Sequence, residues 1–189
     1  PAFWSELFYT HHPFFHKIER QILKVVEKAS QSDNTFSFSN KQIPYLSSRS
    51  FRGLSPRVLD LSKNSITTLD VTLNDFTGLH KLIISGNLFS SRTMPVNAFK
   101  FYARHMPALE TLDISGNPLG VLAEDIASFT SLKNLCVDNT QITALPSTLA
   151  KLDKLLTFSC CSNPLEEIGQ DVELPHSLTS LSLTDCGLH

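Results

Sequence analysis

LDLSKNSI, at residues 59–66, is one of seven similar segments that recur along most of this 189-residue chain. Each segment has apolar residues at its first, third and eighth positions, and a polar residue, most often asparagine, at its sixth. The first position, called i below, is occupied by Phe36, Leu59, Leu82, Leu112, Leu135, Phe158 and Leu181. Successive segments lie 23 residues apart, apart from one interval of 30 residues. A fixed period of this length predicts a solenoid, in which each repeat forms one coil stacked on the next.

Alternating apolar residues at i and i+2 predict a short strand in every coil, with both side chains entering the core. Parallel stacking of these strands about 4.8 Å apart gives a continuous sheet. At i+5 we expect asparagine to turn inward and donate hydrogen bonds to backbone carbonyls where the chain bends. Thr140 and Cys186 replace it in two repeats and can also donate, whereas Lys41 fits poorly and makes the first coil atypical.

The second half of each repeat predicts a convex side of short helices or 3₁₀ turns. Apolar residues recur at i+14, i+17 and i+20, for example Ile126, Phe129 and Leu132, with Pro175 out of pattern. A spacing of three suits such turns. Because this side is bulkier than the strand side, we expect the stack to curve and the strands to line its concave face.

Segments 59–66 (LDLSKNSI) and 112–119 (LDISGNPL) closely resemble the leucine-rich repeat family, and segment 142–152 (ITALPSTLAKL) resembles its 23-residue class. The resemblance covers the chain from Phe36 onward. It implies an α/β leucine-rich repeat solenoid, a curved horseshoe with a parallel concave sheet. That class is common in intracellular proteins and in secreted bacterial effectors that act inside host cells. The resemblance therefore implies a non-enzymatic protein-binding module, without identifying its partner.

Ahead of the repeats, residues 13–28 predict an amphipathic helix with Phe14, Ile18, Ile22 and Val25 on one stripe. Because a solenoid end must be covered, we expect residues 1–32 to form an N-terminal helical cap. A membrane-binding helix is the rival interpretation. Residues 33–189 then hold about seven repeats, the last incomplete, and we expect the chain to be a fragment of a larger protein.

Composition excludes several function classes. A formal charge of −2 and a pI near 6.4 suggest neither a nucleic-acid partner nor an anionic membrane surface. No apolar run approaches the roughly 20 residues that span a bilayer. The four cysteines form no end-cap cluster, and Cys136 and Cys161 are predicted about 8 Å apart, too far for a disulfide. We therefore expect a reducing compartment, the cytosol of its own cell or of a host.

Catalytic and metal-binding patterns find little support. Neither a nucleophile elbow nor a phosphate-binding loop is present, and His11, His12 and His16 lack a carboxylate or thiol that would complete a metal site. Asp113 and Asp138 could face each other across neighbouring strands, but without a pocket they do not form an acid–base pair. We expect no cofactor, no metal and no catalytic residue.

On the concave face, positions i−1, i+1, i+3 and i+4 are predicted to be exposed. They carry mostly small polar residues and a sparse acidic line, which suits a basic or polar partner segment. The alternative is that these residues only solvate the sheet, because aromatic anchors of binding hot spots are missing. Our candidates for partner contact are Asp60, Lys81, Ile83, Asp113, Asn134, Cys136 and Asp138.

The 30-residue interval contains seven extra residues, 90–96, ahead of a helical stretch at 97–106. We expect Phe99, Ala103 and Met106 to face the core, with Phe101 among basic residues on the opposite face. That face is either a second contact point or, as we favour, part of an enlarged convex helix on which Phe101 lies flat against the neighbouring coil.

An enzyme-linked alternative also remains open. The chain could be the substrate-recognition domain of a ubiquitin ligase or phosphatase whose catalytic part lies outside it. Effector ligases of this kind mostly use repeats of about 20 residues. The 23-residue period therefore counts against that alternative.

Overall fold

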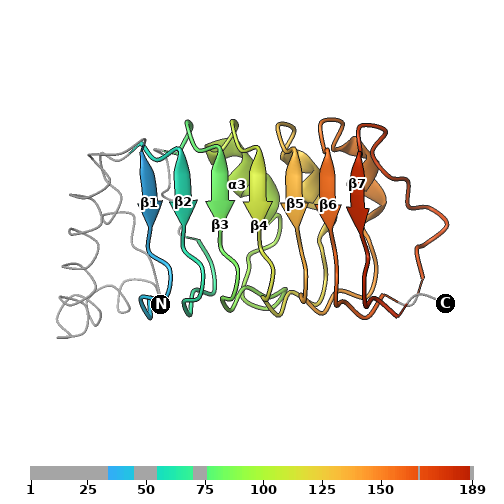
Figure 1. Cartoon of the computed structure of the whole chain (residues 1–189), viewed down its shortest axis with the longest axis horizontal. Coiled ribbons are helices and arrows are strands. Elements are labelled where there is room, and N and C mark those ends of the chain that lie inside the picture. The colour runs from blue at the N-terminus through green and yellow to red at the C-terminus, as the bar shows by residue number, and fades with distance from the viewer. Residues whose placement is uncertain (1–33, 45–54, 70–75, 166, 188–189) are drawn as a thin grey trace.

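In the computed structural model of the protein, the described residues form seven short parallel strands that lie side by side in chain order (Figure 1). The structure describes residues 34–44, 55–69, 76–165 and 167–187. Each strand pairs with the next in the register set by the repeat, so that Leu59 lies opposite Leu82 and Leu135 opposite Phe158. The predicted parallel sheet is confirmed, and its strands are β1 (Thr35–Ser37), β2 (Val58–Asp60), β3 (Lys81–Ile83), β4 (Thr111–Asp113), β5 (Asn134–Cys136), β6 (Thr157–Ser159) and β7 (Ser180–Ser182).

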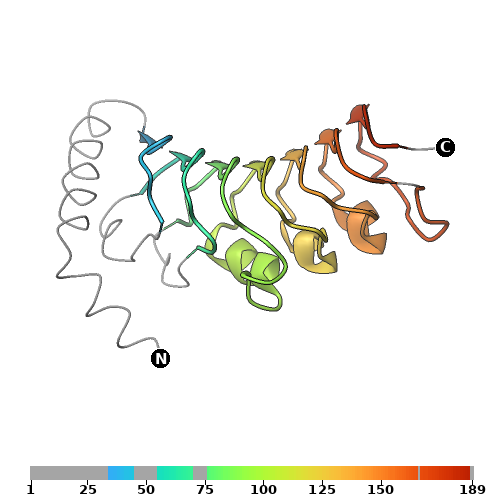
Figure 2. The same cartoon turned by 90° about the horizontal axis from the view of Figure 1, so that it is seen from below.

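The described helices and the strands occupy opposite sides of the solenoid (Figure 2). The α-helix α3 (Ala98–His105) and the 3₁₀ helices η2 (Glu124–Ser128) and η3 (Ser147–Lys151) lie on the convex side. The row of strands bends into a shallow concave face, as the bulkier convex side predicts. The predicted cap at residues 1–32 lies outside the described residues.

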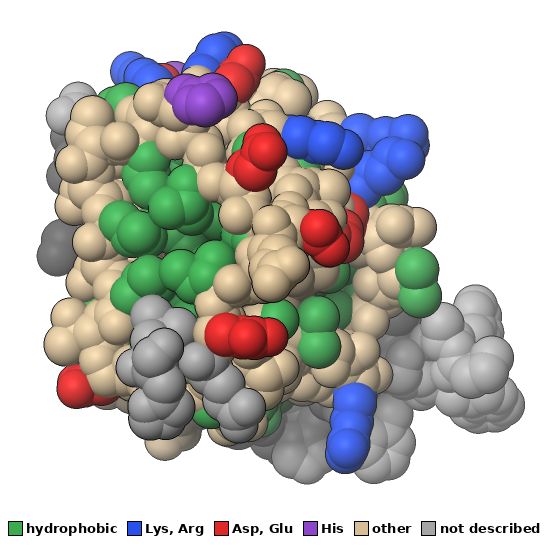
Figure 3. All heavy atoms as spheres, turned by 90° about the vertical axis from the view of Figure 1, so that its right-hand side faces the viewer, with side chains coloured by type: hydrophobic (Ala, Val, Ile, Leu, Met, Phe, Trp, Pro, Cys, Tyr) green, Lys and Arg blue, Asp and Glu red, His purple; other side chains and the backbone are tan. Residues whose placement is uncertain are grey.

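The core is one continuous apolar column between these two sides. The residue at i is buried in every coil from β1 to β6, and Ile126, Phe129 and Leu132 are buried on the convex side as expected. Leu181 in β7 is 40% exposed, whereas its counterpart Phe158 is 1% exposed. Figure 3 shows the hydrophobic side chains that gather at this end of the solenoid. Each coil is thus buried by the neighbours on both of its sides.

Asparagine side chains at i+5 join neighbouring coils through buried hydrogen bonds. Asn87 donates from Nδ2 to the carbonyl of Ile84 in its own coil and to that of Leu61 in the preceding coil, both at 2.9 Å. Its Oδ1 accepts the N–H of Ile66 at 3.0 Å. Asn117 repeats this pattern one coil later, so the expected inward donation is confirmed.

The two replacements of asparagine retain part of this network. Thr140 donates to Val137 of its own coil at 2.7 Å, and Cys186 donates to Cys160 of the preceding coil at 2.9 Å. Lys41 in the first coil is exposed and contributes its backbone N–H to Asn64 Oδ1 at 3.0 Å. The first coil is therefore atypical at this position, as expected.

A left-handed residue precedes the asparagine column in all seven coils, a feature that the sequence pattern did not reveal. Position i+4 has a φ between 52° and 63° in every coil, with residues Asn40, Lys63, Gly86, Gly116, Asn139, Ser162 and Asp185. Glycine adopts this conformation without the steric cost that a Cβ atom brings, and Asn and Asp tolerate it better than most residues. From the second coil onward the side chain after this bend turns into the solenoid, whereas Lys41 in the first coil is exposed.

The longer repeat places its extra residues ahead of α3. Phe99, Ala103 and Met106 are buried, as predicted, and Phe101 is half-buried. The Phe101 ring stacks on the imidazole of His105, with 4.4 Å between ring centroids. Tyr102 is also buried, which we did not predict. Its hydroxyl lies 3.1 Å from Thr68 Oγ1, so it links α3 to the preceding coil.

Asn117→Ala tests the asparagine network. The carbonyl of Ile114 and the N–H of Phe89 would both stay buried after losing the hydrogen bonds that Asn117 makes to them, and the free energy of unfolding should fall by about 3 kcal/mol. Asn117→Thr should cost less, because Thr140 shows that threonine keeps the bond within its coil. Urea unfolding followed by circular dichroism gives the loss.

The matched control is Asn134→Ala, which removes an asparagine from the half-buried concave face. Its loss should be about 1 kcal/mol or less, because water can replace the lost hydrogen bonds. Equal losses for Asn117→Ala and Asn134→Ala would contradict a special role for the buried asparagines.

Candidate functional site

The strand register places the predicted contact residues in two rows on the concave face. One row runs through Lys81, Thr111, Asn134 and Thr157, which lie opposite one another on β3 to β6. The adjacent row brings together Asp60, Ile83, Asp113, Cys136 and Ser159. Asp138 follows two residues after β5. All seven predicted contact residues are exposed or half-buried on this face.

Hydrogen bonds fix two of the acidic side chains in place. Asp60 accepts the N–H of Ser62 at 2.9 Å and the hydroxyl of Ser37 at 3.0 Å. Asp113 Oδ1 accepts the N–H and the hydroxyl of Ser115, at 3.0 and 2.6 Å. Among the described residues, no hydrogen bond to Asp113 Oδ2 occurs. Asp113 is therefore held in one orientation with a carboxylate oxygen available to a partner.

The Asp138 side chain hydrogen bonds to the next coil, which the sequence did not predict. Its Oδ1 accepts the Ser159 hydroxyl and the Cys161 N–H, both at 2.7 Å, and the Cys136 thiol lies 3.3 Å from Oδ2. The residue opposite Asp113 across the strand pair is Cys136. The idea that Asp113 and Asp138 face each other is therefore wrong, because Asp138 turns toward the next coil.

A chain of polar side chains crosses three strands of this surface. Asn134 Nδ2 donates to Thr111 Oγ1 at 3.1 Å, and Thr157 Oγ1 donates to Asn134 Oδ1 at 2.7 Å. We missed Thr111 and Thr157 as members of the site, although their common position at i−1 implied that they would be neighbours. Ser62 occupies position i+3, which was predicted to be exposed, but it is buried. Its hydroxyl donates a hydrogen bond to Ser39 Oγ at 2.9 Å.

Two half-buried thiols on this face differ in acidity. Burial raises the pKa of Cys136 to about 11. Hydrogen bonding with Ser182 and Ser159, whose hydroxyls lie 2.9 and 3.6 Å from the sulfur, lowers the pKa of Cys161. All four cysteines are free thiols. The concave face therefore offers two thiols whose pKa values are shifted in opposite directions, with Cys161 the more acidic of the two.

The rest of the described chain offers little other chemistry. Within residues 34–44, 55–69, 76–165 and 167–187, no three His, Cys, Asp or Glu side chains gather closely enough to hold a metal ion. No helix in this part of the chain is both long and apolar enough to cross a membrane. The polar rows of the concave surface are the candidate functional site.

Thiol labelling tests the electrostatics of this surface. Because the thiolate is the nucleophile, iodoacetamide at neutral pH should alkylate Cys161 well before Cys136. Ser182→Ala should slow the labelling of Cys161 several-fold, because it removes the hydroxyl that lowers its pKa. Peptide mass spectrometry gives both rates, and Cys161→Ser identifies the fast site. Equal rates for Cys136 and Cys161 would contradict this assignment.

Comparison with known proteins agrees with the repeat geometry. The family model described as Leucine Rich Repeat matches residues 108–129, which contain β4 and η2. No curated protein sequence matches the chain. The structural similarities below therefore show its fold and leave its partner open.

Three solved structures are similar at low sequence identity. A leucine-rich repeat protein of Leptospira interrogans matches 76% of this chain and 35% of its own, with a TM-score of 0.65 and 20% identity. The functional domain of InlJ from Listeria monocytogenes, which includes a cysteine ladder, matches 77% and 28%, with a TM-score of 0.57 and 24% identity. The plant peptide hormone receptor RGFR1, solved with RGF2, matches 75% and 22%, with a TM-score of 0.58 and 20% identity.

The matched region spans about a third or less of the length of these structures. They share the coil geometry with this chain, and the family model falls on one of its coils. Together with the seven-stranded parallel sheet, these matches show that the chain has the leucine-rich repeat fold.

Proposed function

We propose that this chain is a protein-binding module that recognises its target on the concave face. The observation that carries the proposal is the fixed orientation of the polar residues there, above all Asp113, whose Oδ1 is held by Ser115. A surface that is already ordered loses little conformational entropy on binding. In this proposal Asp60, Lys81, Ile83, Asp113, Asn134 and Cys136 contact the partner directly.

The charges favour a basic, polar partner segment. Asp60, Asp113 and Asp138 lie along the concave side, and the positive side chains near them are Lys81 and Lys63. The remaining positions are mainly serine and threonine, which are small enough for an extended segment to approach the sheet. Asp138 contributes charge, while its hydrogen bonds to the next coil make it mainly a structural residue.

Two kinds of similar structure support this proposal. RGFR1 is a peptide hormone receptor and was solved in complex with RGF2, so one protein of similar fold binds a partner. Leptospira and Listeria proteins share the same coil geometry. We propose that the module belongs to a larger cytosolic protein or a secreted bacterial effector, acts by binding alone, and selects the target of that protein.

Charge reversal on the concave face tests the proposal. Proteins retained from eukaryotic cytosol by the immobilised chain are identified by mass spectrometry, and the candidate partner is then purified for direct titration. Asp113→Lys should weaken binding about tenfold or more, because it places like charges together in the interface. Circular dichroism should show unchanged folding, since the Asp113 side chain hydrogen bonds only within its own coil.

The control is Asp153→Lys, the same charge reversal at an exposed position on the convex segment of its coil. Its affinity for the partner should equal that of the unmodified chain. If Asp153→Lys and Asp113→Lys weaken binding equally, general charge rather than the concave face governs recognition. If Asp113→Lys binds normally, the concave proposal is wrong.

Ionic strength gives an independent check with the same purified partner. Electrostatic attraction between exposed groups is screened over about 8 Å at physiological salt and about 3 Å at 1 M. The dissociation constant should therefore rise steadily with added NaCl, and its salt dependence should be weaker for Asp113→Asn. A dissociation constant independent of salt would rule out a basic partner segment.

A further inference from the structure

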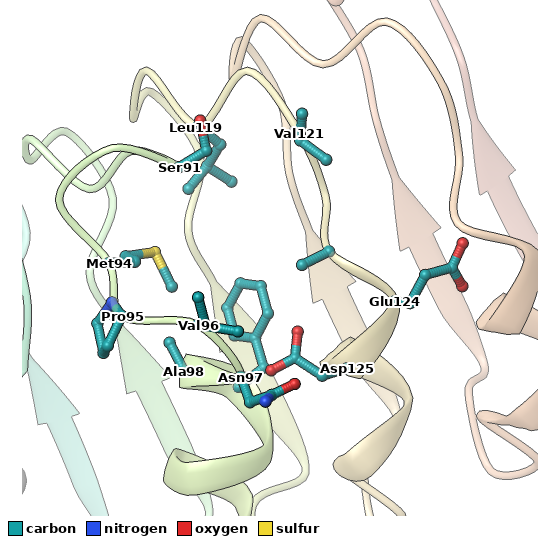
Figure 4. A pocket seen from close by; sticks show the side chains of 12 residues that line it. Ser91, Met94, Pro95, Val96, Asn97, Ala98, Leu119, Val121, Glu124 and Asp125 are labelled. Carbon is teal, nitrogen blue, oxygen red and sulfur yellow. The ribbon is translucent and has the colours of Figure 1, made fainter.

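The extra residues of the long repeat form one wall of a cavity beside the next coil (Figure 4). Its volume is about 280 Å³, just below the roughly 300–1,000 Å³ of sites for cofactors and drug-sized ligands. A space of this size suits one large amino-acid side chain. Most of the wall is apolar, formed by Met94, Pro95 and Val96 from the insertion, Phe99 from α3, and Leu119 and Val121 from the following coil.

Two of these wall residues are unusually exposed. Val96 is 91% exposed and Val121 is 59% exposed, which places both among the few large hydrophobic side chains that the described residues leave in solvent. Single exposed apolar residues need no explanation, but here two from different coils line one hollow. An apolar side chain inserted between them would remove both from water.

Hydrogen bonds hold the insertion in shape. The Ser91 N–H donates to the carbonyl of Leu119 at 3.1 Å, which ties the insertion to the next coil. Thr93 Oγ1 donates to the carbonyl of Thr67 in the preceding coil at 3.0 Å and accepts the N–H of Ser90 at 3.0 Å. The insertion is therefore connected to the coils on both sides, and the cavity exists before any ligand binds.

The charged groups at the cavity are all negative. Glu124 and Asp125 line it, and none of its lining residues is Lys, Arg or His. Asp125 Oδ2 accepts the N–H of Lys100 at 3.0 Å, and Glu124 accepts the N–H groups of Ser147 and Thr148. These neutral donors orient the carboxylates without neutralising them. No ion pair to either carboxylate occurs among the described residues.

The two carboxylates differ in direction. Figure 4 shows Asp125 beside Val96 and Asn97 at the cavity, while the Glu124 side chain turns away toward the next coil. Asp125 is therefore the charged group that a bound ligand would meet first. A positive group next to an inserted apolar side chain would complement both the charge and the lining.

We propose that this cavity is a second protein-contact site, which takes one apolar side chain of a partner segment with Lys or Arg beside it. The site is separate from the concave face and does not depend on its proposed role. It gives the seven-residue insertion a binding function in addition to enlarging the convex side. Asp125 selects the basic neighbour, and Val96 and Val121 enclose the apolar side chain.

The probe is N-acetyl-Leu-Arg-amide, titrated into the ¹⁵N-labelled 189-residue chain and followed by the amide signals of Val96, Val121 and Asp125 in two-dimensional NMR spectra. These signals should shift saturably. N-acetyl-Leu-Glu-amide should bind at least tenfold more weakly, because its carboxylate would meet Asp125. N-acetyl-Ala-Arg-amide should also be weaker, because its methyl group fills little of the cavity.

Two variants separate the apolar and the charged contributions. Val121→Asp should abolish binding, while Leu156→Asp, the same kind of change at an exposed position outside the cavity, should leave it unaltered. Asp125→Asn keeps an oxygen acceptor for the Lys100 N–H. It should reduce the preference for Leu-Arg over Leu-Glu to less than threefold.

Unchanged binding to Val121→Asp would overturn the proposed site. Equal affinities of the unmodified chain for Leu-Arg and Leu-Glu would overturn the basic partner. Shifts confined to concave residues such as Asn134 would show that the dipeptide binds elsewhere, and would also overturn the proposal.

Discussion

The structure depends on one constraint: the buried backbone N–H and C=O groups at the bend of each coil need hydrogen-bond partners. The chain turns from strand to convex segment once every coil, and from the second coil onward the side chain at i+5 hydrogen bonds to backbone groups at that turn. Asn117 does this by bonding carbonyls of two successive coils and an N–H of the preceding one. Because these atoms are buried, leaving them unpaired would be costly. Strand register, and with it the order of the concave rows, follows from this repeated contact.

Much of this architecture could be predicted because it is periodic. Apolar residues recur in every coil at the two positions that Leu59 and Leu61 occupy in the second coil. The strands, the core and the asparagine column could therefore be predicted from the sequence. The left-handed bend at i+4 was hidden, since Lys63 and Ser162 occupy it as well as Gly86 and Gly116. Backbone geometry there is imposed by the coil, and it overrides residue preference.

The candidate surface was predicted less completely. The position of each residue in the repeat predicted that it lies on this face. The hydrogen bonds among these residues also depend on their side-chain rotamers, which the repeat position does not specify. Asp113 and Asp138 have the same charge and lie on the same face, yet one bonds within its own coil and the other bonds to the next. The cavity beside Val96 was also invisible, since it arises where an irregular insertion meets a regular coil.

The most direct test of the concave face as the recognition surface is hydroxyl-radical footprinting of the chain with and without its purified partner. The method reports the solvent exposure of individual side chains. The account predicts that the side chains of Ile83, Cys136 and Cys161 become less reactive toward hydroxyl radicals on binding. The exposed Leu156, directly before β6, and Phe101 in α3 should keep their reactivity. Protection confined to the convex side, with Ile83, Cys136 and Cys161 unchanged, would contradict it.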